Sequence, residues 1–355
     1  MMAGSSALHP DHRIGVVQIG LGPIGQGIVR RVLEMPGVRL VGAVDPAPDK
    51  AGQDVGSLVG RARVGVEVQP RLDPDAVAGA SVALHSTGSH LEAVMDQLLA
   101  LVEAGLSVIS TCEELAWPWH HHPGPAQRLD RAARRAGVTV LGTGVNPGFV
   151  MDLLPLVMTG VCTRVEHVHA RRVVDASRRR GPLQRKIGSG LAPDEFDRLV
   201  AEGRLGHVGL PESAALVAAG MGWRVDRIDN VVRPLIASRP IETPHLSVRA
   251  GQVQGLLQTV TAWQGDRERV RLDLVMALDP PASEDAPTAG GARGVDHLRI
   301  TGEPPLEVVV PGGIFGDTAT VAAVTNAIPR VMEAPPGLLS VKDLAAPGWW
   351  SGAAW

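Results

Sequence analysis

The stretch RIGVVQIGLGPIG, residues 13–25, decides the fold. It begins as a short apolar strand and ends in Gly20, Gly22 and Gly25, spaced as G-x-G-x-x-G directly before a helical pattern of apolar residues. In this motif the first glycine permits a tight turn, the second lets the backbone approach a pyrophosphate, and the third lets helix and strand pack closely. The stretch therefore predicts a strand, a turn and a helix that bind a dinucleotide.

A second strand supports this prediction. VRLVGAVD, residues 38–45, is apolar and ends in Asp45, twenty positions after Gly25. A carboxylate at this point can accept a hydrogen bond from a ribose 2′-hydroxyl and would repel a 2′-phosphate. Lys50 follows five residues later and can soften that preference. We expect the cofactor to be NAD or NADP, with NAD favoured.

Strand and helix patterns alternate through the first 150 residues. The further strand patterns lie at 81–88, 106–110 and 138–144, and the helix patterns at 91–104 and 127–137. Such alternation predicts parallel strands joined by right-handed crossovers. Ser86, Thr87 and Gly88 would end their strand at the same sheet edge as Gly22, near the nicotinamide ribose. The candidate cofactor-binding residues are Gly20, Gly22, Pro23, Ile24, Gly25, Asp45, Ser86, Thr87, Gly88, Thr111 and Asn326.

The strand pattern in LSVISTCEELAWP, residues 106–118, ends in two adjacent carboxylates, Glu113 and Glu114. An open α/β sheet places reactive groups at the carboxyl ends of its strands. If the strand continues, the two side chains point to opposite faces. If a helical turn begins instead, Thr111 and Glu114 have the spacing of a capping box, which would occupy Glu114 structurally. Both alternatives favour Glu113 as the acid/base, with Glu114 as the second choice.

Residues 151–314 predict a second domain. An apolar helix pattern at 151–162 is too short to cross a bilayer, and the basic run at 178–186 is expected to be a solvated loop or a subunit contact. From residue 246 the apolar period changes to two, which indicates an antiparallel sheet with a hairpin at 252–279. Its apolar face needs a cover, either from helices or from a second subunit, so we expect a homo-oligomer.

The C-terminal segment is expected to return to the first domain. A helix pattern at 318–334 contains Pro329, which should kink or end it, and Asn326 would then face the cofactor crevice. The predicted fold is therefore α/β: an N-terminal dinucleotide-binding domain at 1–150 with a parallel sheet, completed by 315–355, and a second α+β domain at 151–314 containing an antiparallel sheet.

Composition narrows the function classes. The formal net charge is −3 among 355 residues, which gives no basic footprint for nucleic acid or an anionic membrane. No apolar run reaches the length of a membrane helix, and the first dozen residues do not resemble a signal peptide. Cys112 and Cys162 are expected to be free thiols in a cytoplasmic protein. The three histidines at 120–122 are adjacent, which is a poor spacing for zinc, so we expect a surface cluster and no metal.

Several motifs together resemble a known family. GLGPIG, STCEELAWPW, GTGVNPGF, RVVDASRRRGPLQRKIGSG, GHVGLPES and the C-terminal NAIP and PGLLSVKDL are similar to those of 2,4-diaminopentanoate dehydrogenases and the related native NAD(P)-dependent amine dehydrogenases. The resemblance runs from about residue 13 to 346, and STCEEL with GxNPGF is its most specific part. The histidine-lysine motif of true dihydrodipicolinate reductases is absent from this sequence, which disfavours that activity.

The resemblance implies a Rossmann domain, a substrate domain of the dihydrodipicolinate-reductase type, a dimer, and reversible oxidative deamination of an amine to a ketone and ammonia. The catalytic glutamate of the family corresponds to Glu113. Asn146, Phe149, Val150 and His207 are the candidate substrate-pocket residues. Because Phe149, Val150 and Met151 would form an apolar wall, simple alkyl amines are favoured over diaminopentanoate. The alternatives are an ammonia-independent NAD(P)-dependent reductase and a non-catalytic dinucleotide-binding protein.

Overall fold

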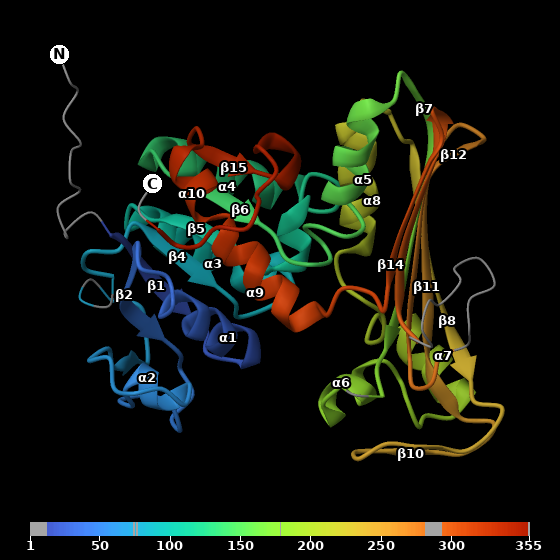
Figure 1. Ribbon diagram of the computed structural model, residues 1–355, viewed down its shortest axis with the longest axis horizontal. Coiled ribbons are helices and arrows are strands. Elements are labelled where there is room, and N and C mark those ends of the chain that lie inside the picture. The colour runs from blue at the N-terminus through green and yellow to red at the C-terminus, as the bar shows by residue number, and fades with distance from the viewer. Residues whose placement is uncertain (1–12, 74, 76, 178, 281–292, 354–355) are drawn as a thin grey trace. The chain divides into compact units, whose positions relative to one another are not determined.

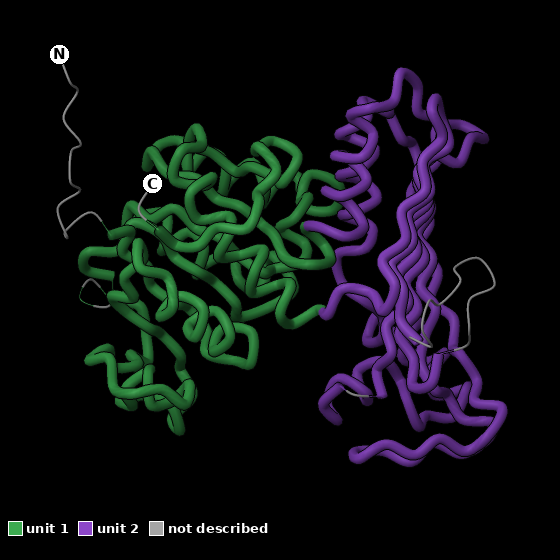
Figure 2. The backbone as a smooth tube through the Cα atoms, in the orientation of Figure 1, with its two compact units in different colours: residues 1–148, 316–355 green, residues 149–315 purple. Residues whose placement is uncertain are grey.

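The computed structural model describes residues 13–73, 75, 77–177, 179–280 and 293–353. The chain divides into two compact units (Figure 2). Unit 1 consists of residues 1–148 and 316–355, and unit 2 of residues 149–315.

The described part of unit 1 is built on a seven-stranded sheet (Figure 1). Its strands are β1 (Ile14–Ile19), β2 (Val38–Val44), β3 (Val68–Gln69), β4 (Val82–His85), β5 (Ser107–Ser110), β6 (Thr139–Gly142) and β15 (Gly337–Leu339). Their order is β15-β6-β5-β4-β1-β2-β3, and every pair is parallel. The order reverses between β1 and β4, so the loops after these strands flank the point where open α/β sheets bind ligands.

Helices join the strands of unit 1 as the sequence predicts. They are α1 (Pro23–Val32), α2 (Val55–Leu58), α3 (Leu91–Glu103), α4 (Pro123–Ala136), α9 (Gly316–Asn326) and α10 (Ile328–Glu333), with the short 3₁₀ helices η1 (Glu113–Ala116) and η4 (Val341–Asp343). α4 begins with a proline, whose missing N–H is harmless in the first turn, and ends at Gly137 with φ of 71°. The apolar side of α3, including Leu91, Leu98 and Val102, is buried against the sheet.

The C-terminal segment contributes a strand as well as helices. The helix predicted at 318–334 is divided into α9 and α10, and Pro329 lies in the first turn of α10, as its missing N–H requires. After α10 the chain adds β15 beside β6. Sequence inspection missed β15 because three residues are too short to establish a period.

The described part of unit 2 contains a six-stranded mixed sheet. Its strands are β7 (Arg164–Asp175), β8 (Arg227–Ile236), β11 (Val253–Gln264), β12 (Arg267–Ala277), β13 (Val295–Glu303) and β14 (Leu306–Pro311), in the order β14-β13-β7-β12-β11-β8. The predicted hairpin at 252–279 is confirmed as β11 and β12. The sheet is not wholly antiparallel, because β7 pairs with β12 in parallel. The long segment between β7 and β12 provides the crossover that a parallel pair needs.

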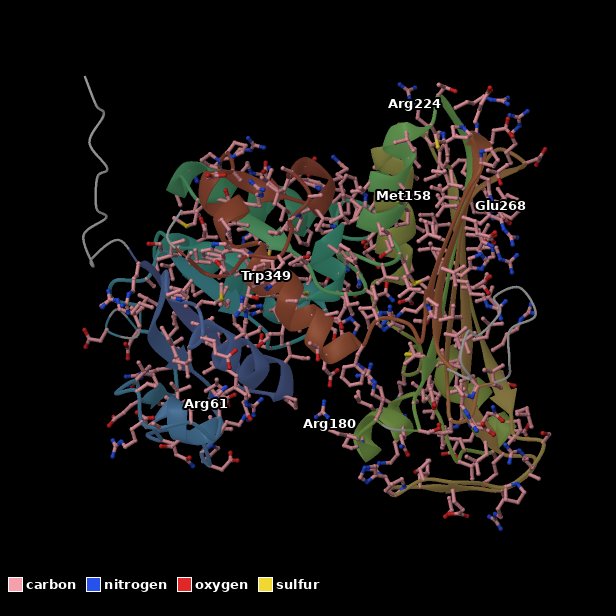
Figure 3. All side chains as sticks on the ribbon, viewed as in Figure 1. Arg61, Met158, Arg180, Arg224, Glu268 and Trp349 are labelled. Carbon is pink, nitrogen blue, oxygen red and sulfur yellow. The ribbon has the colours of Figure 1, made fainter. Side chains whose placement is uncertain are left out.

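Unit 2 also contains helices and a small ribbon. They are α5 (Leu153–Met158), the 3₁₀ helix η2 (Thr159–Val161), α6 (Gly181–Lys186), α7 (Pro193–Ala201) and α8 (Leu210–Gly220), with the ribbon of β9 (Ile241–Glu242) and β10 (Ser247–Val248). Figure 1 shows α5 and α8 beside one another on one side of the six-stranded sheet. The basic run 178–186, predicted as a loop or subunit contact, contains α6, whose N-cap is Arg180 (Figure 3). Pro182 in its first turn and Arg185 and Lys186 in its last turn favour this helix.

Within the described ranges, no helix combines the length and apolar character needed to cross a membrane.

Candidate functional site

The glycine turn between β1 and α1 has the conformations that its spacing predicts. Gly20 has φ of +85°, which a side chain would strain. A Cβ on Gly25 would lie 1.9 Å from the carbonyl oxygen of Gly20, so only glycine allows this helix to approach the strand. A Cβ on Gly22 would meet nothing within 4 Å. Gly22, the N-cap of α1, has no side chain that could cap the first amides of the helix, and helix starts of this kind bind anions.

The first turn of α1 contains the remaining residues of the motif. Pro23 and Ile24 are its first residues, directly after Gly22. Gln18, which is fully buried, donates from Nε2 to the carbonyl of Gly20 at 2.8 Å and to Ser86 Oγ at 3.0 Å. The turn is therefore braced against the loop that follows β4.

Asp45 directly follows β2 and is 6% exposed. Its carboxylate accepts hydrogen bonds from the backbone amides of Leu21 at 2.7 Å and Ala47 at 3.0 Å, and from Lys50 Nζ at 2.9 Å. Burial acts to raise the pKa of Asp45, but the amide of Ala47, the ammonium of Lys50 and the amide of Leu21 together hold it below its ordinary value. Asp45 thus stays ionised, and Lys50 neutralises part of its charge.

The loops after β4 and β5 lie side by side at the same sheet edge. The amide of Thr111 donates to the carbonyl of His85 at 2.9 Å, and that of Glu114 to Ser89 at 3.2 Å. Thr87 is exposed and Gly88 half-buried beyond β4, while Thr111 is half-buried beyond β5. These residues and the glycine turn therefore lie around one edge of the sheet, at the reversal of strand order.

Glu113 and Glu114 begin η1, so the strand does not continue through them. The predicted capping box is wrong. The N-cap is Cys112 rather than Thr111, and no side chain caps this turn. Glu114 is instead bound by a different helix: its carboxylate accepts from the amide of Leu91, the first residue of α3, at 2.7 Å. A carboxylate is stabilised at that position by the positive end of the helix.

Two histidines complete the contacts of Glu114. His90 Nδ1 lies 2.8 Å from Oε1, and His122 Nε2 lies 3.1 Å from Oε2. Both carboxylate oxygens are therefore engaged in holding α3 and the start of α4 beside η1. Glu113, its neighbour, is half-buried at the start of η1. The structure thus assigns Glu114 a structural role, as the sequence suggested, for a different physical reason.

The histidines at 120–122 are not equivalent. His120 and His121 are exposed and their ring centroids lie 4.3 Å apart, whereas the His122 side chain is only 19% exposed because it reaches Glu114. In the part of the chain that the structure describes, no group of three or more His, Cys, Asp and Glu side chains is arranged to hold a metal.

Cys112 is a buried thiol at this edge. Burial raises its pKa to about 12, and its Sγ donates to the carbonyl of Ser89 at 3.2 Å. A thiol that remains protonated is a poor nucleophile, so Cys112 packs the loop rather than reacting.

The candidate substrate-pocket residues lie in both units. Asn146, 8% exposed, follows β6 in unit 1, whereas Phe149, Val150 and His207 belong to unit 2. Val150 is 4% exposed and lines a small cavity with Leu154, Ala170 and Leu298. Val150 is therefore a core residue of unit 2, and Met151 is fully buried too. The apolar wall expected from 149–151 stays a prediction.

The loop carrying His207 is held at its backbone. Gln258 on β11 accepts from the amide of His207 at 2.7 Å and donates to its carbonyl at 3.2 Å. Gln258 is 1% exposed, so both bonds are made away from solvent. The His207 backbone is thus fixed against the sheet of unit 2.

Asn326 has a structural partner in unit 1. Its Oδ1 accepts from the amide of Trp350 at 3.1 Å, which ties the end of α9 to the C-terminal tail. A role for Asn326 at the cofactor stays a prediction.

Sequence inspection missed three polar residues of this edge: Gln18, His85 and Ser110. All three are fully buried, within strands whose other residues are largely apolar. A polar side chain inside a strand covered on both faces must find partners, and that signal could have identified them.

Comparisons with known proteins identify the family of this chain. The family model described as the 2,4-diaminopentanoate dehydrogenase C-terminal domain matches residues 149–354. The chain is 32% identical over 352 residues to 2,4-diaminopentanoate dehydrogenase of Acetoanaerobium sticklandii, covering 94% of both proteins. It is 23% identical over 350 residues to an amine dehydrogenase of Streptomyces virginiae, covering 93% of this chain and 96% of that one.

A solved structure has the same fold. The amine dehydrogenase from Mycobacterium smegmatis superimposes with a TM-score of 0.82 at 24% identity, covering 97% of this chain and 99% of that one. The agreement extends over both units. The family match over more than half of the sequence, together with a 32% identical relative of nearly equal length, leads to one conclusion: the chain belongs to the 2,4-diaminopentanoate dehydrogenase family.

Proposed function

We propose that this protein is an NAD(P)-dependent amine dehydrogenase, which interconverts a primary amine with a ketone or aldehyde and ammonia. The observation that carries the proposal is the position of Glu113 in a chain of this family. Glu113 begins η1 directly beyond β5, at the sheet edge where the glycine turn and the loop after β4 also lie. Its neighbour Glu114 is bound to Leu91, His90 and His122 and is committed to structure.

The residues of unit 1 fit a dinucleotide. The uncapped start of α1 at Gly22, where a Cβ would meet nothing, suits a pyrophosphate. Asp45 and Lys50 would meet the 2′ position of the adenosine ribose. Pro23, Ile24, Ser86, Thr87, Gly88 and Thr111 complete the proposed site. A bound nicotinamide would supply the hydride chemistry of the reaction.

Glu113 would move the proton. An amine carbon can give up hydride only after its ammonium nitrogen has lost a proton, so oxidation needs a base beside the nitrogen. In the opposite direction the protonated carboxyl helps water leave the carbinolamine formed from ketone and ammonia. The resulting iminium carbon is then ready to accept hydride. Asn146, Phe149, Val150 and His207 are the proposed substrate-pocket residues.

The direct test is a panel of short ketones, aldehydes and amino-ketone acids, assayed with ammonium and with NADH and NADPH separately. We expect oxidation of the reduced cofactor that requires both the carbonyl compound and ammonium. Equal rates without ammonium would identify an ammonia-independent reductase instead. No turnover with any member of the panel would contradict the proposal.

A specific observation favours 2,4-diaminopentanoate as a second candidate substrate. The relative with 32% identity over nearly its whole length is named for it. In addition, Val150 and Met151 are buried in unit 2, which weakens the sequence argument for simple alkyl amines. The panel should therefore include 2,4-diaminopentanoate in the oxidative direction beside a simple alkyl amine.

Removing the ammonium of Lys50 should change the cofactor preference. In Lys50→Ala, Asp45 loses the partner at 2.9 Å and presents its full charge to a 2′-phosphate. We expect the KM for NADPH to rise about tenfold more than that for NADH, the scale of a close charge pair near the surface. Lys50→Arg, which keeps the charge, is the matched control. An equal change for both cofactors would show that Lys50 does not act at the 2′ position.

We propose that the protein is a cytoplasmic homodimer, with the dinucleotide bound by unit 1 and the substrate by unit 2. Cys112 and Cys162 are free thiols, as suits a reducing compartment. In unit 2, the buried row of Ala170 and Leu272 faces the helices. By strand alternation the opposite face carries cross-strand pairs such as His169 with Asp273, 2.9 Å apart. If a second copy covers that face, the molecular mass measured in solution should be that of two chains.

A further inference from the structure

His85 connects the two loops that border the proposed active site. It is the last residue of β4 and is fully buried. Its Nδ1 lies 2.8 Å from Ser110 Oγ, at the end of β5, and its Nε2 lies 3.0 Å from Gln97 Oε1 and 2.8 Å from Thr87 Oγ1. A single side chain therefore spans both strand ends.

The partners of the ring fix which nitrogen carries the proton. Gln97 Oε1 can only accept, so Nε2 is the donor to Gln97. Nδ1 is then the acceptor and receives the hydroxyl proton of Ser110. Burial lowers the pKa of His85 to about 4, which keeps the ring neutral and this pattern intact at ordinary pH.

The hydrogen bonds continue to the loop that carries Glu113. Ser110 Oγ accepts from the backbone amide of Cys112 at 3.1 Å, one residue before Glu113. At the other end Thr87 donates to Gln97 Oε1 at 2.7 Å. Because the chain ends on a backbone amide, which does not exchange protons during turnover, it can transmit position but cannot relay protons to Glu113.

Hydrogen bonds to backbone atoms also couple the loop after β4 to the loop after β5. The amide of Thr111 donates to the carbonyl of His85, and Cys112 Sγ and the amide of Glu114 both donate to Ser89. The loops after β4 and β5 are thus joined along their length, and His85 is the buried side chain that links them. A change at Thr87 would reach the amide before Glu113 through two side chains, His85 and Ser110.

We propose that His85 is a positioning residue that aligns Thr87, on the cofactor side, with Glu113, on the proton-transfer side. The assignment rests on the proposed function and deepens it. The Nδ1 bond to Ser110 sets the loop of Glu113, and the Nε2 bonds set Gln97 and Thr87. The Nδ1 side of the ring should therefore affect proton transfer, and the Nε2 side should affect cofactor binding. Different substitutions can test the two effects separately.

Two amide substitutions separate them. In His85→Gln the terminal amide lies near the place of Nε2, so the bonds to Gln97 and Thr87 can persist while that to Ser110 is lost. In His85→Asn the amide lies near the place of Nδ1, so the reverse holds. For His85→Gln we expect kcat to fall about tenfold, as for loss of one buried hydrogen bond, with a shifted pH profile and an unchanged cofactor KM. For His85→Asn we expect the cofactor KM and Kd to rise about tenfold with kcat nearly unchanged.

Thr139→Val is the matched control. Thr139 is 2% exposed at the opposite end of the same sheet, and its hydroxyl donates to the carbonyl of Pro335 at 3.0 Å. Its loss should lower the melting temperature and leave kcat and KM unchanged. If both His85 variants change kcat and cofactor KM by the same factors, or behave like Thr139→Val, His85 is a packing residue and the proposal is overturned.

Titration with the cofactor distinguishes failure of the His85 proposal from failure of the proposed function. If the wild-type chain binds dinucleotide but turns over no amine, the proposed function fails. The Kd values of His85→Asn and His85→Gln then decide the present proposal. A weaker Kd in His85→Asn alone supports the coupling, and equal Kd values overturn it.

Discussion

Glu113→Gln should lower kcat by about 10²- to 10⁴-fold in both directions, the range that removal of a general acid or base produces. The amide has the size of the carboxylate but can neither take a proton from the ammonium nor return one to the departing water. The melting temperature of the variant separates a loss of catalysis from a loss of folding. Initial rates at saturating substrate and cofactor measure the effect.

Glu114→Gln is the matched control for that experiment. The variant loses the charge that faces the start of α3, His90 and His122, and we expect a destabilisation of about 1–2 kcal/mol. Its kcat should fall far less than that of Glu113→Gln. If kcat instead falls far more in Glu114→Gln than in Glu113→Gln, Glu114 is the acid/base and the assignment of Glu113 is wrong.

Asp296→Asn should destabilise the protein by about 3–5 kcal/mol, because it leaves a buried guanidinium without its counter-ion. Arg172 and Asp296 have side chains only 4% and 5% exposed. Arg172 Nη1 donates to both carboxylate oxygens at 2.9 Å, and Asp296 also accepts from the amide of Ile314 at 2.7 Å. The pair therefore anchors the segment that leads out of unit 2. Urea unfolding of the full chain measures the loss.

The pKa shifts of Asp296 and Arg172 predict which substitutions restore the stability lost in Asp296→Asn. Burial raises the pKa of Asp296 despite Arg172, and burial lowers the pKa of Arg172 despite Asp296. Desolvation thus outweighs the attraction, so the pair adds little net stability although each partner requires the other. The double variant Arg172→Met, Asp296→Leu should recover most of the stability lost in Asp296→Asn. If the free energy of unfolding of Asp296→Asn lies within about 1 kcal/mol of the wild-type value, well below the range for breaking a buried ion pair, this account is contradicted.

The sequence predicted the features that depend on local pattern. GLGPIG specified the turn, because Gly20 needs a positive φ and Gly25 a close approach, and both follow from spacing. Five strands of unit 1, β1, β2, β4, β5 and β6, were predicted because runs buried on both faces are continuously apolar, whereas β3 and β15 are too short to show a pattern. The strand end at 106–110 was correct for the same reason, and it placed Glu113 and Glu114 at the sheet edge.

The features that the sequence did not reveal depend on partners far along the chain. The pairing of β7 with β12 joins segments about a hundred residues apart, and no local pattern encodes its direction. One alternative had Glu114 capping its own turn, but its carboxylate instead accepts from the amide that begins α3, 23 residues earlier in the chain.

The central claim, that this protein exchanges an amine for a carbonyl group, is tested most directly by the product. The purified full chain should be given a ketone from the active panel, isotopically labelled ammonium and reduced cofactor, and the products should be identified by mass spectrometry. The account predicts labelled amine in a one-to-one ratio with the cofactor oxidised, and almost none with Glu113→Gln. An alcohol as the product, or cofactor oxidation that forms no labelled amine, would contradict it.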